Sequence, residues 1–239
     1  MGHRVDVILF DLDGTLIEPG IDFAALNARV LQTCYEAGVD VSTWEHLPAL
    51  EIIERAVEAL GRTDASGAAN LAITANRAII EIELEAAARV SPYPGVPEML
   101  QGLMDAGYRL GIVTRNSRQA VQVALGRWPL PYGVLLTRDD VAHVKPDPEH
   151  LAAALSALGA VDSTVLMVGD HPMDIAAGKA IGALTAAVHS DAIGIERLRL
   201  AGPDVILERV TDLVSFLDAR VGQSGHRPDS GSGDDRRRG

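Results

Sequence analysis

The chain has 239 residues, of which 47% are hydrophobic and 23% charged, so it is long enough for one or two globular domains with a buried core. Its formal net charge of -12 disfavours non-specific binding to nucleic acid and to anionic membrane surfaces. A small anionic substrate stays compatible with this charge, because a local group of cations can override the field of the whole chain.

The first predicted element is a buried strand at Val5–Phe10, a short apolar run that stops at an acid. No convincing strand follows between about Ile17 and Ser91, a stretch of some 75 residues that is far too long for a structureless loop in a compact domain. Its apolar residues recur at helical spacing, which predicts three or four helices, roughly at Phe23–Ala37, Leu47–Leu60 and Ala65–Arg89. We expect a helical module inserted after the first strand; the alternative is a set of extra helices packed on the sheet.

Strands and helices alternate over the rest of the chain. The predicted strands are short apolar runs at Tyr108–Val113, Tyr132–Leu136, Thr164–Val168, Leu184–Val188 and, more weakly, Asp204–Leu207. The predicted helices between them lie at Pro97–Ala106, Ser117–Leu125, Pro148–Leu158 and Met173–Ile181. This alternation predicts an α/β fold with a doubly wound parallel sheet, covered by helices on both faces.

These elements predict three parts of the chain. Residues 1–16 and 92–221 would form the α/β core, and residues 17–91 would form an all-helical cap domain. Residues 222–239 lack apolar content and are rich in glycine, serine and charge, which is typical of a disordered tail.

The cellular location follows from what the chain lacks. A single cysteine, Cys34, cannot form an internal disulfide, which is typical of a reducing compartment. The apolar run near the N-terminus is too short for a signal peptide, and no stretch approaches the roughly 20 apolar residues of a membrane span. We therefore expect a cytoplasmic protein with no membrane partner.

The first chemical motif is the string DLDGT after the first strand. Asp11 and Asp13 are two residues apart at the exit of a strand, so both can face the same side, and Gly14 permits a sharp turn there. Such a pair can bind a divalent cation, or divide the roles of nucleophile and general acid/base. The alternative is an ordinary strand-end turn, in which Asp and Gly are also common.

Two further motifs are weak when taken alone. Thr114 follows a predicted strand and precedes a predicted helix, which suits an anion, and Arg115 and Asn116 add hydrogen-bond donors. Two prolines follow Lys145, at positions 146 and 148, and would stiffen the backbone next to it, so a lysine fixed in this way can neutralise a phosphoryl oxygen or a carboxylate. A plain helix cap at Thr114 and a solvated surface lysine are the corresponding structural explanations.

The fourth motif is GDHPMD, in which Asp170 follows an apolar run and Asp174 lies in the first turn of a helix. Acids at a helix start are also common as caps. Ligands of open α/β sheets bind beyond the carboxyl ends of the strands. Since all four motifs lie at or after such ends, we expect them to meet at one edge of the sheet and to bind a metal and a phosphate.

The ordered set DLDGT, strand-end Thr, Lys-Pro and GDxxxD resembles the haloacid-dehalogenase-like hydrolase superfamily over about residues 5–218. The chain looks most like its phosphoglycolate-phosphatase-like branch, whose helical cap follows the first motif. The resemblance implies that Asp11 is the nucleophile and that Asp13 is the general acid/base. It also implies that Mg²⁺ is bound by Asp11, the Asp13 carbonyl and Asp170.

The same resemblance implies roles for the remaining residues. Thr114 and Lys145 would bind the phosphoryl oxygens, and Asp174 would support the metal site or Lys145. The sequence departs from the family pattern at His171, where Ser is frequent, and at Arg115, where many relatives have Asn. Arg115 and Asn116 are therefore candidates for contacts with phosphate or substrate, whereas we assign no role to His171.

The expected activity is Mg²⁺-dependent hydrolysis of a small phosphomonoester through an aspartyl-phosphate. Phosphoglycolate, a sugar phosphate and a nucleotide monophosphate all remain open as substrates, and the oligomeric state is not readable from the sequence. A 2-haloacid dehalogenase would lack the second acid of the first motif, which is present here as Asp13. A phosphosugar mutase and a non-catalytic binding module also compete with this activity. Against them, the stretch LIEPGIDF does not resemble the mutase branch, and no expected catalytic residue is missing.

Overall fold

The computed structural model describes residues 4–191 and 193–224. They form a six-stranded sheet in the order β3-β2-β1-β4-β5-β6, and every neighbouring pair of strands is parallel. The strands are β1 Val7–Phe10, β2 Arg109–Val113, β3 Val134–Leu136, β4 Val165–Gly169, β5 Leu184–Val188 and β6 Val205–Leu207. The strand order reverses between β1 and β4, and ligands of such folds bind at that point.

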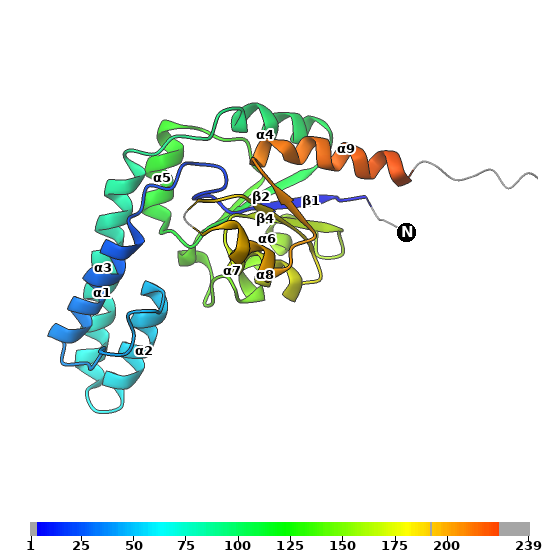
Figure 1. Cartoon of the computed structure of the whole chain (residues 1–239). Coiled ribbons are helices and arrows are strands. Elements are labelled where there is room, and N and C mark those ends of the chain that lie inside the picture. Colours follow the sequence, from blue (N-terminus) through cyan, green and yellow to red (C-terminus); the bar gives the residue numbers. More distant parts are fainter. Residues whose placement is uncertain (1–3, 192, 225–239) are drawn as a thin grey trace, which may run out of the picture.

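The central strand explains why both faces of the sheet carry helices. All four residues of β1 are buried, and their side chains alternate between the two faces. Ile8 and Phe10 pack into the core beneath α4 (Val96–Asp105), α5 (Arg118–Arg127) and α9 (Leu213–Ser224). Val7 and Leu9 pack on the opposite side, together with residues of α6 (Pro148–Ala157) and α7 (Pro172–Ala180). Figure 1 shows α4 and α9 on one side of the sheet and α6, α7 and α8 on the other.

Three helices between β1 and β2 form an arm that extends away from the sheet (Figure 1). They are α1 Phe23–Glu36, α2 Ala49–Gly61 and α3 Ala65–Ala87. Most of their large buried residues, among them Val30, Ile52 and Ile79, form a hydrophobic cluster separate from those of the sheet, whereas Ala87 at the end of α3 packs into the core of the sheet. This confirms the predicted fold class, a doubly wound α/β core with an inserted helical cap.

The two chain segments that join the cap to the core run side by side. The amide of Glu18 donates to the carbonyl of Ser91 at 2.9 Å, and the amide of Tyr93 donates to the carbonyl of Leu16 at 3.1 Å. Ile17 and Pro92 form an antiparallel bridge between these bonds. The cap is therefore attached through one narrow, paired connection, supplemented by contacts between α3 and α5.

All six predicted strands and all seven predicted helices are present, with ends shifted by at most two residues. Two helices were not predicted: α8 at Ile195–Ala201 and α9 at Leu213–Ser224. α9 includes residues 222–224, so the predicted disordered tail begins too early there; residues 225–239 lie outside the described residues.

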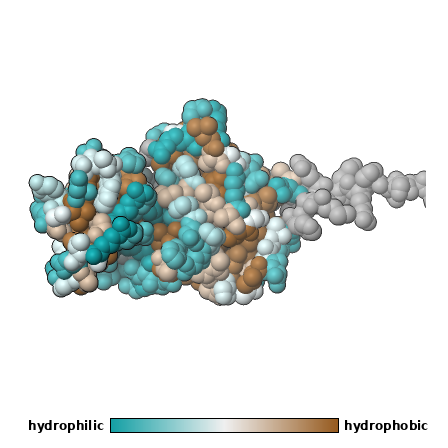
Figure 2. Space-filling model, turned by 90° about the horizontal axis from the view of Figure 1, so that it is seen from below, coloured by the Kyte–Doolittle hydropathy of each residue, from teal (hydrophilic) through white to brown (hydrophobic). Residues whose placement is uncertain are grey.

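Within the described residues, none of the helices is both long enough and apolar enough to cross a membrane. Hydrophilic and hydrophobic residues are intermingled over the face that Figure 2 shows. Among the exposed large hydrophobic side chains, Tyr35 and Ile73 lie on the cap helices and Leu200 lies on α8.

Candidate active site

The four sequence motifs lie together at the carboxyl edge of the sheet. Asp11 directly follows β1, and its amide donates to the carbonyl of Val168 in the neighbouring strand β4 at 2.9 Å. Asp170 directly follows β4, and Thr114 directly follows β2. Because these three strands are adjacent and parallel, side chains that are up to 159 positions apart in the sequence reach one space.

Lys145 connects two of the acids. Its ammonium group lies 2.7 Å from Oδ1 of Asp11 and 2.7 Å from Oδ1 of Asp174, and the side chain is 1% exposed. The preceding loop reaches the site before α6 begins, where Asp147 caps the helix by accepting from the amide of Glu149. Burial lowers the pKa of Lys145, but the carboxylates of Asp11 and Asp174 outweigh it and raise that pKa above its usual value. The two carboxylates therefore stabilise the charged form of Lys145 beside Asp11.

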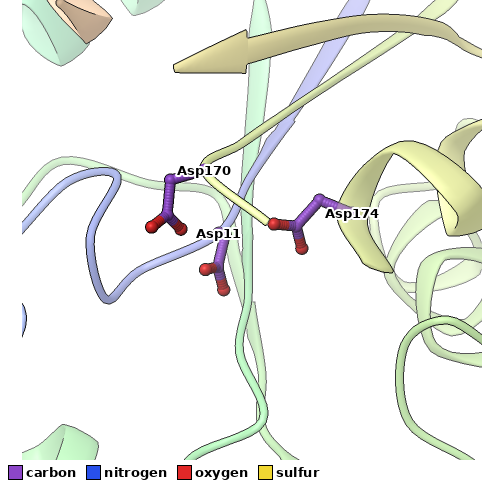
Figure 3. A group of neighbouring side chains, drawn as sticks. All are labelled: Asp11, Asp170 and Asp174. Atoms are coloured by element: carbon purple, nitrogen blue, oxygen red, sulfur yellow. The ribbon is translucent and has the colours of Figure 1, made fainter. Parts of the chain in front are cut away.

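The carboxylates of Asp11, Asp170 and Asp174 face one another (Figure 3), and one oxygen of each lies within 4.8 Å of the others. Asp174 is held by Lys145 and by the amide of His171, which donates to its Oδ2 at 3.1 Å. Burial, followed by the charges of Asp11 and Asp174, raises the pKa of Asp170 to about 8. Burial also raises the pKa of Asp11, although Lys145 opposes this. Such crowding of acids is relieved when a cation binds.

Asp13 is held away from this cluster by the chain that follows β2. Its Oδ2 accepts a hydrogen bond from Nδ2 of Asn116 at 2.8 Å and a longer one from Oγ1 of Thr114 at 3.5 Å. Burial, followed by the charges of Asp11 and Glu83, raises the pKa of Asp13 to about 7. A carboxyl group with this pKa can give and take a proton at neutral pH.

Gly14 lets the turn after β1 pass close to Asp170. Its φ of +79° is in the left-handed region, which favours glycine. A Cβ atom at this position would lie 2.3 Å from Oδ2 of Asp170. The next residue, Thr15, donates from Oγ1 to Oδ1 of Asp170 at 3.4 Å. The turn that carries Asp13 therefore also positions Asp170.

The two departures from the family pattern have different surroundings. His171 caps α7, because its Nδ1 accepts from the amide of Met173 at 3.1 Å, and burial lowers its pKa to about 4. Arg115 donates from Nη1 to Sδ of Met173 at 2.8 Å, whereas its buried Nε has no hydrogen-bond partner. Burial lowers the pKa of Arg115, and the nearby carboxylates of Asp11 and Asp174 oppose that shift. Arg115 is thus a second cation near the acids.

Two residues near the site were missed by the sequence reasoning. Glu83, in the cap helix α3, forms a buried ion pair with Arg138, which follows β3. Glu83 also accepts from the amide of Ser117 at 3.1 Å, at the start of α5. Nothing in the local pattern signals this contact, because Glu83 and Arg138 are 55 positions apart in the sequence.

The sequence of this chain is similar to those of known proteins. Residues 8–188 match the model of the family described as haloacid dehalogenase-like hydrolase. A protein named pyrophosphatase PpaX from Bacillus cereus is 35% identical over 217 residues, which cover 90% of this chain and 97% of that protein.

Two solved structures have the same fold. A hydrolase from Pseudomonas syringae is 25% identical with a TM-score of 0.64, over 90% of this chain and 98% of that one. A predicted phosphoglycolate phosphatase from Haemophilus somnus is 22% identical with a TM-score of 0.61, over the same two shares. The second likeness shows the fold alone.

Proposed function

The chain belongs to the haloacid dehalogenase-like hydrolases, and from that premise we propose that it is a phosphatase in which Asp11 attacks the phosphorus of a small phosphomonoester. The observation that carries this assignment is the contact of Lys145 with both Asp11 and Asp174, with Asp13 held two residues further along the chain. A nucleophile, a fixed cation and a proton-transfer group then lie together at the carboxyl edge of the sheet.

The proposed reaction has two steps. In the first, a carboxylate oxygen of Asp11 forms a bond to phosphorus while the bond to the leaving oxygen breaks, and Asp13 gives its proton to that oxygen. In the second, Asp13 takes a proton from water, which attacks the aspartyl-phosphate, releases phosphate and restores the Asp11 carboxylate. Thr114 and Lys145 bind the phosphoryl oxygens, and Asp174 orients Lys145. Positioning and charge neutralisation supply most of the acceleration in such reactions.

The acid cluster fits a divalent cation, which we propose is Mg²⁺. When all three carboxylates are ionised, they exceed the charge of Lys145 by two, and one divalent ion would balance that excess and favour the ionised form of Asp170. Asp11, Asp170 and the backbone carbonyl of Asp13 would hold it, since hard cations take oxygen ligands. When bound, the ion would offset the negative charge of the phosphoryl group.

The positive charge of Arg115 indicates which substrates the site would favour. A second cation near Asp11 and Asp174 favours a substrate whose leaving portion also carries negative charge, such as the carboxylate of phosphoglycolate or the second phosphate of inorganic pyrophosphate. The 35% identity to a protein named pyrophosphatase supports pyrophosphate as a second candidate.

We place the activity in the cytoplasm, where the free, buried Cys34 suits a reducing environment. We assign residues 17–91 as the cap that covers the substrate.

The competing activities are less well supported. Asp13 is superfluous to a dehalogenase, because no leaving oxygen needs a proton. Fold neighbours titled β-phosphoglucomutase are 14% and 20% identical to this chain, so they support the shared fold and no particular activity. A binding module would not need the paired acids Asp11 and Asp13.

The first test is phosphate release from phosphoglycolate, a hexose phosphate, a nucleoside monophosphate and pyrophosphate in the presence of Mg²⁺. The wild type should release phosphate from at least one compound, and Asp11→Asn should lower turnover by at least about 10³-fold because the nucleophile is lost. Circular dichroism should show an unchanged fold. Near-normal turnover by Asp11→Asn would remove Asp11 as the nucleophile.

The second test is the metal requirement. Turnover should be lost in excess EDTA and restored by Mg²⁺, because the cluster otherwise keeps its uncompensated charge. A ligand that binds only the folded state stabilises it by about 2.7 kcal/mol when the ligand is at 100 times its Kd. Mg²⁺ should therefore also raise the Tm of the protein. Full activity in EDTA, together with a Tm that Mg²⁺ leaves unchanged, would rule out the metal site.

A further inference from the structure

A buried ion pair joins the cap to the core directly behind the proposed acid/base residue. Glu83 is 3% exposed and Arg138 is 7% exposed at the side chain. Buried ion pairs are weak evidence for stability, because removing two charges from water offsets most of their attraction. The position of this pair therefore calls for an explanation other than stability.

Both partners form hydrogen bonds with the backbone of the same short loop, residues 115–117. Oε2 of Glu83 accepts from the amide of Ser117 at 3.1 Å. Arg138 donates from Nη1 to the carbonyl of Arg115 at 3.2 Å, and its backbone amide donates to the carbonyl of Asn116 at 3.3 Å. Three successive residues of the loop are thus held at their backbones.

This loop in turn holds Asp13. Asn116 donates from Nδ2 to Oδ2 of Asp13 at 2.8 Å, and the amide of Asn116 donates to Oγ1 of Thr114 at 3.1 Å. A continuous chain of contacts therefore runs from the cap helix α3 through Glu83 and the loop to Asp13. A displacement of α3 from the core would loosen the loop and with it the hydrogen bond to Asp13.

We infer that Glu83 and Arg138 are positioning residues that set the orientation of Asp13 for proton transfer and make it depend on the place of the cap. The inference deepens the proposed function and rests on it, since Asp13 is the proposed acid/base. Neither residue has a hydrogen bond or ion pair with Asp13 among the described contacts, so each positions Asp13 through the backbone of residues 115–117 and the side chain of Asn116. Separately from this positioning, the charge of Glu83 raises the pKa of Asp13.

The test compares two leaving groups. 4-Nitrophenyl phosphate releases a stable phenolate and needs little protonation, whereas the alkyl ester phosphoglycolate depends on a general acid. Glu83→Gln should lower kcat/KM for phosphoglycolate by about 10-fold and for 4-nitrophenyl phosphate by less than about threefold, because a general acid contributes roughly 10²–10⁴-fold. Equal losses for both compounds, or no loss, would overturn the inference.

Two further variants separate positioning from general damage. Glu81→Gln removes the same charge two residues away on α3, where Glu81 is 57% exposed and pairs only with the exposed Arg77 among the described ion pairs, so it should leave both values unchanged. In an Asn116→Ala background, Glu83→Gln should cause no additional loss, because the path to Asp13 is already cut. Additive losses would show that Glu83 acts by another route.

A crystal structure gives an answer that does not depend on turnover. In Glu83→Gln, or in Arg138→Lys if the first variant does not fold, the distance from Asn116 Nδ2 to Asp13 Oδ2 should lengthen from 2.8 Å to beyond hydrogen-bond reach. An unchanged distance in the variant would overturn the inference. A wild type that hydrolyses neither these two compounds nor any other member of the panel would instead count against the proposed function, and the crystal structure would still decide the positioning role.

Discussion

At the scale of single residues, the site is organised by the imbalance between acids and cations. Lys145 is buried between Asp11 and Asp174, which leaves Asp170 without a cationic partner among the described ion pairs. Like charges at this separation cannot all stay ionised without cost, and burial makes the cost larger. Groups with strongly shifted pKa values cluster at functional sites, so the same crowding that destabilises the acid cluster supports its assignment as a functional site.

Asp170→Asn should therefore stabilise the protein while it removes activity. Loss of one charge from the cluster should raise stability in EDTA by about 1 kcal/mol, which corresponds to a rise in Tm of roughly 2–4 °C for a chain of this size. Scanning calorimetry measures the shift. A lower Tm in EDTA would mean that the acids are not in conflict, and the gain in Tm on adding Mg²⁺ should be smaller than in the wild type.

At the scale of elements, the turn after β1 links the first motif to the fourth. Gly14 brings the backbone so close to Asp170 that no side chain fits between them. The same turn carries Asp13 and Thr15, which meet Asn116 and Asp170 respectively. A parallel sheet places such turns side by side, and the close approach then requires glycine at this one position.

Gly14→Ala should lower kcat by at least about 10-fold, because a 1 Å misplacement in an active site can cost about 10²-fold. The matched control is Gly38→Ala in the cap, where φ is +85° but no atom lies within 4 Å of the added Cβ. Gly38→Ala should lose about 1–2 kcal/mol from the strained backbone alone, measured by urea unfolding. Gly14→Ala should lose more, because its Cβ also clashes with Asp170. Equal kinetics in the two variants would show that the contact with Asp170 is unimportant.

At the scale of the whole molecule, the cap and the sheet have separate hydrophobic clusters. The cap cluster lies among α1, α2 and α3, and the connection to the core is two paired segments. Regions of a protein with their own core can open separately. The structure therefore predicts that α1, α2 and the part of α3 that lies in the cap cluster unfold as one unit. The end of α3 is anchored to the core by Ala87, which belongs to the cluster of the sheet, by contacts with α5 and by the Glu83–Arg138 pair.

Ile52→Ala tests this division. The side chain is fully buried in the cap cluster, so truncation should cost about 2–5 kcal/mol. Hydrogen exchange should then speed up across the cap helices while β1 and β4 stay protected. Ile8→Ala in β1, which is equally buried, should speed exchange throughout the sheet instead. A uniform increase in both variants would mean that the chain opens as a single unit.

Local sequence patterns predicted most of the strands and helices of this protein and the positions of its motif residues. Apolar runs mark the six strands, helical spacing marks the cap, and the motif acids and Lys145 follow strand ends in the expected order. The short α8 has one buried residue, Leu198, so its pattern was too weak to detect. The sequence could also place Asp11, Asp170 and Lys145 at one edge, because parallel strands present their carboxyl ends together.

Only the tertiary structure decided which partners these residues take. Asp13 accepts a hydrogen bond from Asn116, Lys145 lies between Asp11 and Asp174, and Glu83 in the cap pairs with Arg138 in the core. Contacts of this kind join side chains far apart in the sequence, and they depend on how whole elements pack. Periodicity describes one element at a time, so it determines the elements and their motifs, whereas packing alone determines the hydrogen bonds and ion pairs between them.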